Sequence, residues 1–334
     1  MSAVRMSFAG GGTDMPEYYN EYGGNVITST INQFTYAVIQ HRHDQSFQAF
    51  SPDFQKHYKP TKFEKIQIED GTEIAASVIK YLKYKSGINV MLCSDVPAGS
   101  GLGASSSLAV NLVNTIKTLE EEKWTREHIA ETAFHIGRHI LKWPIGKQDE
   151  YISAFGGFRF IKFEKDKVKV SSTKLTRSSL EELEKNILLF FIGKTRNSSD
   201  ILSNQIERIK RKEHDTMNSL AYVKELAQTM HESLNKSDIT KFGELLHKGW
   251  LAKKQFAKGV TNPHIDKIYK RALENGAMGG KLAGAGGGGH MLFYCESPKQ
   301  KKFIKKMESL GLKQVNFGFY NDGPKILNLY NLNK

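Results

Sequence analysis

The stretch DVPAGSGLGASSSL, residues 95–108, follows an apolar segment at residues 88–93 and precedes a segment with apolar residues at helical spacing. We therefore expect a strand over residues 88–93 and a helix that begins near Ala104. Because glycine has no Cβ atom, this turn lets backbone N–H groups approach an anion, and the helix directs its unpaired amides and positive dipole end to the same point. The stretch predicts a phosphate-binding loop, although a plain loop with a helix cap has a similar composition.

Two other segments carry long glycine runs: VRMSFAGGGTD at residues 4–14 and KLAGAGGGGH at residues 281–290. Such runs cost conformational entropy and pack no side chains, so they indicate places where the backbone approaches something closely. No Lys-Ser or Lys-Thr pair follows the central glycines and their spacing is GxGxG, which matches neither a Walker loop nor a dinucleotide-binding motif. Three glycine runs in one chain predict one shared site.

The order and spacing of these segments resemble the three signature motifs of the GHMP small-molecule kinases. An arginine, Arg5, precedes a Thr-Asp pair, the central loop reads PxGxGLGxSSS, and a late loop reads GAGGGG. Within that family, GKQDEYISAFGG (residues 146–157) and GKTRNSSDIL (residues 193–202) are most similar to bacterial D-glycero-D-manno-heptose 7-phosphate kinases. The resemblance covers nearly the whole chain. It implies a two-domain α+β fold: a ribosomal-protein-S5-like domain over residues 1–172 and a ferredoxin-like domain over 185–334, with the site between them. Periodicity alone predicts only α+β with mixed sheets.

The same resemblance implies an ATP- and Mg²⁺-dependent kinase that phosphorylates the anomeric hydroxyl of a sugar phosphate. Its expected reaction converts D-glycero-α-D-manno-heptose 7-phosphate to the 1,7-bisphosphate, which would supply GDP-heptose synthesis for surface polysaccharide. Two other interpretations stay open. One is a kinase for L-fucose or an N-acetylhexosamine, and the other is a non-catalytic sugar or ATP sensor on the same fold.

The resemblance also assigns roles to single residues. Asp149 takes the place of the general base, and Arg5 takes the place of the arginine beside it. Asp14 takes the place of the aspartate that holds sugar hydroxyls, and Gly11-Gly12 stands where galactose kinases have Glu-His, which leaves room for a larger sugar. The residues expected to bind the nucleotide are Gly99, Ser100, Gly101, Leu102, Gly103, Ala104, Ser105 and Ser106. The residues expected to bind the sugar phosphate are Gly10, Gly11, Gly12, Thr13, Asp14, Lys147, Arg196, Ser198, Ser199, Lys281, Gly286 and Gly287.

The magnesium site is where the chain departs from the family pattern. Many relatives have a metal-binding glutamate on the helix before the catalytic aspartate, where this chain has Gly137. Glu131 lies nearly two turns earlier and is a poor substitute. We therefore expect Ser105, ATP oxygens and water to hold Mg²⁺, an ion that keeps much of its hydration shell. The alternative is that Ser105 and Ser106 only cap the helix.

Composition agrees with a globular kinase. The chain has 334 residues, 39% of them hydrophobic and 25% charged, and a net charge of +13 that suits anionic substrates or serves solubility. The basic runs at residues 208–212 and 299–307 lie on amphipathic segments, so we expect solvated helix faces and no nucleic-acid partner. Two cysteines, Cys93 and Cys295, lie in apolar runs and are expected to be reduced and buried. Without a signal peptide or a membrane-spanning run, a cytoplasmic location and no membrane partner are expected, and a homo-oligomer is possible.

Hydrophobic patterning predicts several further elements. Two strands are expected at residues 25–31 and 34–40, a hairpin at 158–163 and 168–171, and a helix over 126–141. The polar run at residues 171–185 is expected to join the two domains. Four helices are expected in the second half, at residues 200–212, 215–235, 238–258 and 263–275.

Overall fold

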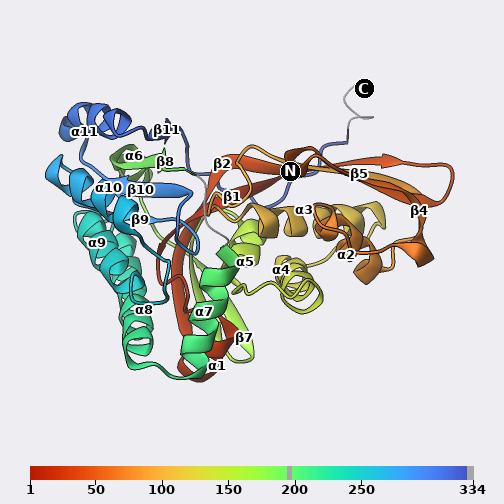
Figure 1. Cartoon of the computed structure of the whole chain (residues 1–334), viewed down its shortest axis with the longest axis horizontal. Coiled ribbons are helices and arrows are strands. Elements are labelled where there is room, and N and C mark those ends of the chain that lie inside the picture. Colours follow the sequence, from red (N-terminus) through yellow and green to blue (C-terminus); the bar gives the residue numbers. More distant parts are fainter. Residues whose placement is uncertain (194–197, 329–334) are drawn as a thin grey trace.

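The protein is described here by a computed structural model that covers residues 1–193 and 198–328. Within these residues the N-terminal half contributes to a seven-stranded sheet and the C-terminal half forms a four-stranded sheet, each covered by helices (Figure 1). This mixed-sheet arrangement confirms the predicted α+β class.

The larger sheet has the strand order β4-β3-β5-β2-β6-β7, and β1 pairs with β2 beside this path. Only the β3–β5 pairing is parallel among the pairs of this sheet. The strands are β1 (Ser2–Ala9), β2 (Gly24–His41), β3 (Ser46–Ser51), β4 (Lys56–Lys62), β5 (Ile88–Ser94), β6 (Phe158–Glu164) and β7 (Lys167–Ser172). The predicted strand at residues 88–93 and the predicted hairpin are confirmed.

Strand β2 is the centre of this sheet, and it corrects the expectation of two separate strands. Its first part pairs with β6, its middle with β1 and its last part with β5, so the segment stays extended through residues 32 and 33. The partners of β2 therefore impose continuity that the local pattern does not show.

Helices cover one face of the larger sheet (Figure 1). They are α2 (Glu73–Leu82), α3 (Ala104–Leu119), α4 (Arg126–His135) and α5 (Gln148–Phe155), and a short α1 (Pro16–Tyr22) follows β1. Helix α3 begins at Ala104 as predicted. The α-helix expected over residues 126–141 ends at His135, because the next five residues form a π-helical turn, Ile136–Ile140.

The smaller sheet has the antiparallel order β11-β8-β10-β9. Its strands are β8 (Ile187–Phe191), β9 (Gly279–Leu282), β10 (His290–Tyr294) and β11 (Lys313–Val315). The helices of this half are α7 (Ser198–Lys210), α8 (His214–Asn235), α9 (Phe242–Lys253), α10 (Pro263–Glu274) and α11 (Ser297–Ser309). The four predicted helices correspond to α7 through α10.

The polar run at residues 171–185 is not simply an open linker. Much of it forms α6 (Arg177–Asn186), which Thr176 caps by accepting a hydrogen bond from the Ser179 amide at 3.2 Å. Leu183 of this helix is buried. The run connects β7 to β8, and Leu183 and Asn186 are the buried residues of its helix.

One of the three hydrophobic clusters that the described residues form joins the two sheets. It combines β1 and β2 residues with residues of α8, α9, β8 and β10. Phe8 of β1 stacks on Phe158 with ring centroids 5.1 Å apart and meets Phe242 of α9 edge-on at 5.4 Å. The two halves therefore share part of their core through β1, while domain boundaries at 172 and 185 stay a prediction.

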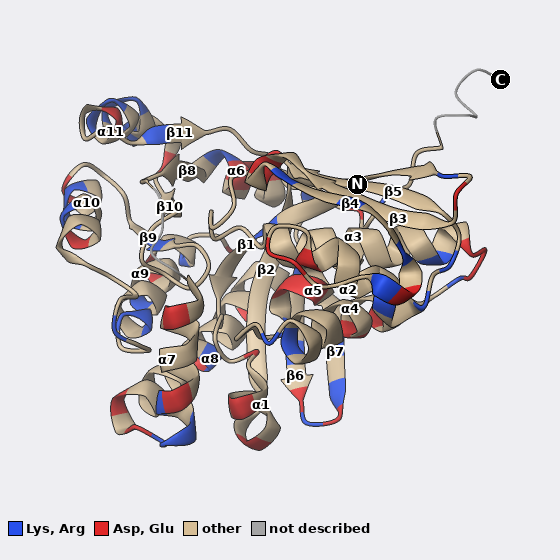
Figure 2. Cartoon of the chain, turned by 45° about the vertical axis from the view of Figure 1, so that its right-hand side comes forward, with Lys and Arg blue, Asp and Glu red and all other residues tan. Residues whose placement is uncertain are grey.

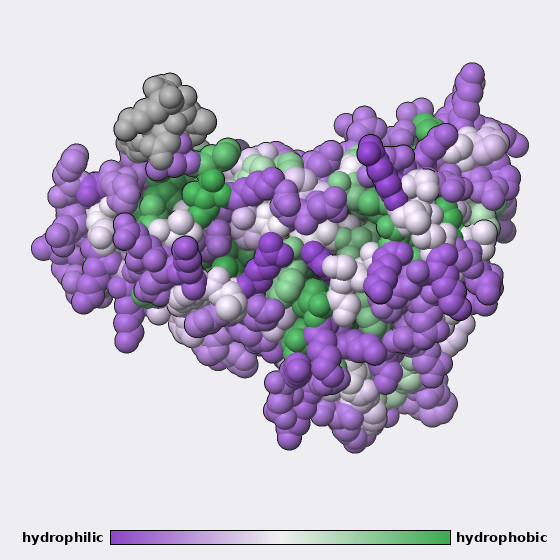
Figure 3. Space-filling view, turned by 180° about the vertical axis from the view of Figure 1, so that it is seen from behind, coloured by the Kyte–Doolittle hydropathy of each residue, from purple (hydrophilic) through white to green (hydrophobic). Residues whose placement is uncertain are grey.

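Most charged side chains lie on the surface of the molecule. Lys and Arg alternate with Asp and Glu along the outer helices and turns (Figure 2), and from behind most of the molecule is hydrophilic with separate hydrophobic patches (Figure 3). No helix in the described part of the chain has the length and apolarity needed to cross a membrane. Both cysteines are free; Cys295 is buried as expected, but Cys93 is half-buried because it lies on the face of β5 opposite the core residues Ile88, Val90 and Leu92.

Candidate active site

The three glycine runs meet at one cavity. The turn after β1, the loop before α3 and the loop between β9 and β10 line it, together with the start of α7 and the segment before α5. Lining residues that the sequence had singled out are Arg5, Gly11, Gly12, Asp14, Gly99, Ser100, Gly101, Gly103, Ala104, Ser105, Ser106, Asp149, Ser198, Ser199, Lys281 and Gly286. The shared site predicted from three distant segments is therefore a single cavity.

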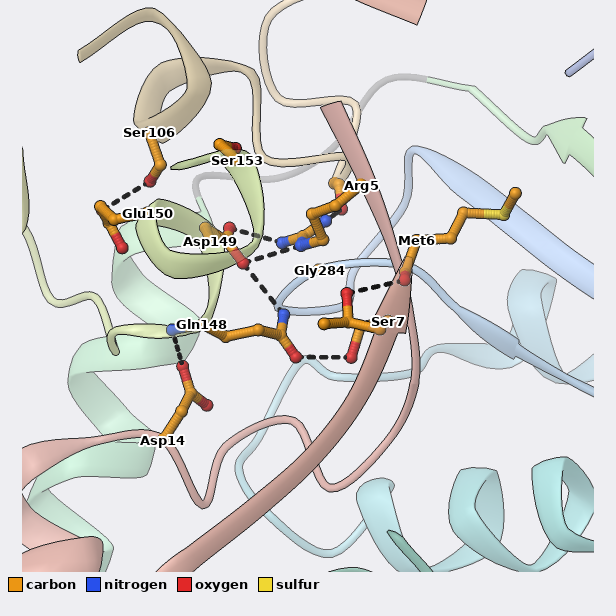
Figure 4. A network of polar contacts seen from close by, with 12 residues as sticks. Arg5, Met6, Ser7, Asp14, Ser106, Gln148, Asp149, Glu150, Ser153 and Gly284 are labelled. Atoms are coloured by element: carbon orange, nitrogen blue, oxygen red, sulfur yellow. Dashed lines mark hydrogen bonds and ion pairs between the residues drawn. The ribbon is translucent and has the colours of Figure 1, made fainter. Parts of the chain in front are cut away.

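Arg5 and Asp149 form a bidentate ion pair in this cavity (Figure 4). Arg5 Nε donates to Asp149 Oδ1 at 2.7 Å, and Nη2 donates to Oδ2 at 2.6 Å. The third guanidinium nitrogen, Nη1, donates to the Gly101 carbonyl at 2.5 Å. Buried β1 supplies the arginine and the first turn of α5 supplies the aspartate, so two rigid elements fix the pair.

A chain of hydrogen bonds through Gln148 also reaches Asp149, at the oxygen that accepts from Arg5 Nε. Ser7 Oγ donates to Gln148 Oε1 at 2.8 Å, and Gln148 Nε2 donates to Asp149 Oδ1 at 2.9 Å. The relay runs from β1 to α5, as the Arg5 pair does. Both polar ends of the Gln148 amide are thereby used.

Asp14 is buried at the edge of the same cavity. Its Oδ1 accepts a hydrogen bond from the backbone N–H of Gly12 at 2.8 Å, and its Oδ2 accepts one from the backbone N–H of Gln148 at 3.1 Å. Burial, and then the negative charge of Asp149, raise the pKa of Asp14 above its usual range. The two carboxylates thus line one cavity, Asp14 from the turn before α1 and Asp149 from the first turn of α5.

The glycines of the central loop allow close packing against neighbouring segments as well as leaving space for a ligand. A Cβ atom on Gly101, whose φ is +80°, would lie 2.7 Å from the Ala283 carbonyl oxygen of the late glycine loop. A Cβ atom on Gly103 would lie 3.1 Å from Asp149 Oδ2. Leu102 does not line the cavity but is fully buried in the cluster that joins the sheets. The expected role of Gly101 in admitting phosphate is therefore joined by a structural one.

The serines at the start of α3 differ from each other. Ser105 is exposed and lines the cavity, whereas Ser106 is buried and donates to Glu150 Oε1 at 2.7 Å. The N-cap residue is Gly103, with no side-chain capping bond. Ser106 therefore serves a neighbouring helix rather than capping its own.

Glu150 is a buried carboxyl group that the sequence did not single out. It follows Asp149 on α5, and its Oε2 has no hydrogen-bond partner within the described residues. Burial, and then the charge of Asp149, raise the pKa of Glu150 to about 8. The signal in the sequence was the Asp-Glu pair, but only its first member matched the family motif.

Two buried lysines, Lys253 and Lys281, also line the cavity. Lys253 Nζ donates to the carbonyls of Leu282 at 3.1 Å and Gly284 at 2.5 Å, so it holds the late glycine loop. Lys281 has no hydrogen-bond acceptor in the described chain. Burial, and then the charge of Arg5, lower the pKa of Lys281 to about 7. Lys253, which sequence reasoning missed, belongs to no motif, so only the fold brings it here.

Several expected sugar-phosphate residues lie elsewhere or have structural roles. Lys147 is not among the lining residues, because its Nζ donates to Glu131 Oε1 at 2.6 Å. Thr13 Oγ1 donates to the Gly10 carbonyl at 2.8 Å, and a Cβ atom on Gly10 would collide with the Asn25 carbonyl. Gly287 is likewise outside the set that lines the cavity. Arg196 lies outside the described residues.

Gly137 packs closely against the segment before α5. Gly137 is buried in the π-helical turn, and a Cβ atom on it would lie 2.7 Å from Ile145 Cδ1 and 3.4 Å from the Trp143 ring. Trp143 and Ile145 themselves line the cavity. The segment before α5 therefore occupies space that a glutamate at this position would need.

Known protein families match both halves that form this cavity. The model of the GHMP kinases N terminal domain matches residues 73–157, and that of the GHMP kinases C terminal domain matches residues 230–311. The chain belongs to the GHMP kinase family. Its two-domain α+β architecture is therefore confirmed, and the protein is an ATP-dependent phosphotransferase.

Several relatives within the family are sugar kinases, and others are mevalonate kinases. The chain is 30% identical over 328 residues to D-glycero-alpha-D-manno-heptose 7-phosphate kinase of Campylobacter jejuni, with 96% of each chain covered. A crystal structure described as a D-glycero-D-manno-heptose 1-phosphate kinase from Bacteroides thetaiotaomicron matches with a TM-score of 0.80, 25% identity and 98% of each chain covered. An L-fucokinase/L-fucose-1-P guanylyltransferase of Bacteroides fragilis is 26% identical, covering 92% of this chain and 35% of that protein.

Proposed function

We propose that this kinase transfers the γ-phosphoryl group of ATP to the C1 hydroxyl of D-glycero-α-D-manno-heptose 7-phosphate and releases the 1,7-bisphosphate. The observation that carries the proposal is the bidentate Arg5–Asp149 pair in a cavity formed by all three glycine loops. The 30% identity to a heptose 7-phosphate kinase over 96% of the chain supports the choice of sugar. ATP and this sugar phosphate are the proposed partners.

Asp149 is the proposed general base. In the reaction, the C1 hydroxyl proton passes to an Asp149 oxygen while the C1 oxygen bonds to the γ-phosphorus and the bond to the β-phosphate oxygen breaks, releasing ADP. The two hydrogen bonds from Arg5 and one from Gln148 orient the carboxylate; Oδ1 accepts two of them and Oδ2 one, which leaves a lone pair on Oδ2 for this proton. An anomeric hydroxyl is more acidic than an ordinary alcohol, so a carboxylate is a sufficient base in a loose transition state.

The loop before α3 is the proposed nucleotide site. Its lining residues and the N-terminus of α3 present backbone amides and a positive dipole end to the cavity. The described residues contain no group of three His, Cys, Asp or Glu side chains that could hold a metal. Mg²⁺ at this site would therefore have few protein ligands. The exposed Ser105 hydroxyl is the candidate protein ligand, and nucleotide oxygens and water would supply the rest. Bound there, Mg²⁺ would neutralise phosphate charge.

The other wall of the cavity suits the sugar phosphate. Asp14 would accept hydrogen bonds from sugar hydroxyls, and Gly11 and Gly12 line the cavity beside it with backbone atoms only. Lys281, which has no acceptor of its own among the described residues, and Ser198 and Ser199 at the start of α7 are the proposed anion-binding groups. Lys147 is withdrawn from this set because Glu131 already neutralises it.

A kinase for L-fucose is a second candidate function. The resemblance to the Bacteroides fragilis L-fucokinase extends over 92% of this chain. L-Fucose lacks a phosphate, so this function would leave Lys281 without an anionic partner from the sugar. That mismatch makes the heptose phosphate the better-supported substrate.

Phosphorus NMR of the products tests the proposal. ATP, Mg²⁺ and the enzyme are incubated separately with D-glycero-D-manno-heptose 7-phosphate, the corresponding 1-phosphate, L-fucose, galactose and N-acetylglucosamine. We expect fastest turnover with the 7-phosphate and a new signal from phosphate on C1. Because one relative is named for a 7-phosphate and another for a 1-phosphate, transfer to the 1-phosphate is the sharpest contradicting result, and faster turnover of an unphosphorylated sugar would also refute the proposal.

A further inference from the structure

Besides Ser198 and Ser199, helix α7 places a further polar side chain, Gln205, at the sugar side of the cavity. Gln205 lies two turns from the start of α7, is 3% exposed and lines the cavity. Its Nε2 has no hydrogen-bond partner within the described part of the chain. Gln205 belongs to none of the glycine motifs, and the chemistry proposed above does not use it.

The environment of Gln205 does not explain why an amide is present. Nε2 lies 2.8 Å from where a Cβ atom on Gly12 would be, and the same Cβ atom would be 2.9 Å from the Phe256 ring and 3.2 Å from Leu220. These apolar neighbours would pack equally well against a leucine. Buried amide donors without acceptors are rare in proteins because leaving one unpaired costs free energy. Nε2 is itself buried in the free enzyme, but Gln205 lines the cavity, so a turn of its side-chain amide toward a bound ligand would give this donor an acceptor.

Gln205 and Asp14 flank Gly12 with opposite hydrogen-bonding character. The Gly12 amide donates to Asp14 Oδ1 at 2.8 Å, while Gln205 Nε2 lies against the Cα side of the same residue. A carboxylate accepts hydrogen bonds, and an amide nitrogen donates them. A sugar hydroxyl both donates and accepts, so a sugar edge placed over Gly12 satisfies both groups.

We propose that Gln205 is a specificity-determining residue whose Nε2 donates a hydrogen bond to a hydroxyl oxygen of the sugar, beside the hydroxyls that Asp14 binds. The inference rests on the proposed function, because it assumes that the sugar that receives the phosphoryl group binds at this wall of the cavity. It does not depend on which sugar is the substrate. A site that pairs a buried amide with a hydroxyl discriminates strongly against sugars that lack that hydroxyl.

The test compares Gln205→Leu with Gln228→Leu, a matched change on the surface of α8, where the amide donates to Glu232. Steady-state kinetics of both variants and the wild type are measured with the heptose 7-phosphate, L-fucose and galactose. Wild-type rates identify the accepted sugar and so test the proposed function separately, and that sugar is then used for the variants. For Gln205→Leu we expect KM for the sugar to rise about 5- to 100-fold, with KM for ATP within about twofold of wild type.

Thermal unfolding separates this role from a structural one. Because Nε2 is unpaired without sugar, Gln205→Leu should leave the Tm of the free enzyme unchanged or raise it, while most of the Tm increase caused by the sugar is lost. An unchanged KM for the sugar would overturn the inference, as would equal increases in KM for the sugar and for ATP. If the leucine variant does not fold, Gln205→Met, which is closer in shape, is measured by the same criteria.

Discussion

The two walls of the cavity are built differently. On the Arg5 wall, Arg5, Asp149, Gln148 and Ser7 satisfy one another through hydrogen bonds of 2.5 to 2.9 Å, counting the bond to the Gly101 carbonyl. On the α7 and β9 wall, Gln205 Nε2 is unpaired and Lys281 has no acceptor among the described residues. The difference indicates that the first wall is preorganised before ligands arrive, whereas the second is completed by a ligand.

The largest expected effect comes from replacing Asp149, the proposed general base on the hydrogen-bonded Arg5 wall. Asp149→Asn keeps the shape of the side chain and removes its ability to take a proton, so kcat should fall about 10²- to 10⁴-fold. Calorimetry should show ATP binding within about threefold of wild type, since the nucleotide loop is unchanged. Asp166→Asn, an exposed change in the turn between β6 and β7, is the control. Near-wild-type kcat in Asp149→Asn would remove Asp149 from the chemistry and break the comparison.

Two buried lysines sharpen the comparison, because one has acceptors and the other has none among the described residues. Lys281→Met should weaken sugar-phosphate affinity about 10- to 100-fold without lowering the Tm. Lys253→Met should lower the Tm, since it strands the Leu282 and Gly284 carbonyls that Lys253 binds. A loss of Tm in Lys281→Met with unchanged affinity would show that both lysines serve the fold.

Lys281 also predicts a pH dependence. With its pKa lowered to about 7, the side chain loses its positive charge as pH rises through 7, so binding an anion above that pH requires proton uptake. We expect sugar-phosphate affinity in the wild type to fall by up to about tenfold per pH unit above pH 7, as measured by calorimetry. Lys281→Met should lose this slope. The exposed change Lys301→Met should keep it.

Glu150 follows Asp149 on α5 and is buried, so its protonation tests whether the hydrogen-bonded wall of the cavity also contains a neutral carboxyl group. In the folded state the pKa is raised from 4.5 to about 8, so between these values the folded protein holds a proton that the unfolded chain releases. The free energy of unfolding should therefore fall by about 1.4 kcal/mol for each pH unit as pH rises through this window. Glu150→Gln should remove that contribution in denaturant titrations from pH 5 to 8, whereas exposed Glu308→Gln should not. Identical pH profiles in the wild type and Glu150→Gln would contradict a buried neutral carboxyl group.

The smallest effect is expected from the hydrogen-bond relay. Ser7→Ala removes the bond that fixes Gln148 Oε1, and so loosens the Gln148 amide that holds Asp149. We expect kcat to fall about three- to tenfold with KM for both substrates nearly unchanged, because only orientation of the base is affected. Ser203→Ala, an exposed change on α7, is the control. An increase in KM without a change in kcat would place Ser7 in substrate binding rather than in positioning Asp149.

The sequence by itself determined the family and the parts of the site that local motifs encode. Glycine runs signal close backbone approach wherever they occur, so the three loops and their shared cavity could be predicted. Helix α3 and strand β5 were equally legible, since a short apolar run and a helical repeat depend on neighbours along the chain. The pairing of Arg5 with Asp149 followed from the family motif.

Only the tertiary structure decided which polar groups have partners. Lys147 and Lys281 are equivalent in a sequence, but Glu131 neutralises the first and burial isolates the second. Gln205 carries no motif and reaches the cavity only because α7 packs over Gly12. Likewise, only the fold brings Gly137 against Trp143 and Ile145. Burial and hydrogen-bond partners arise from residues distant in the chain, so no local pattern encodes them.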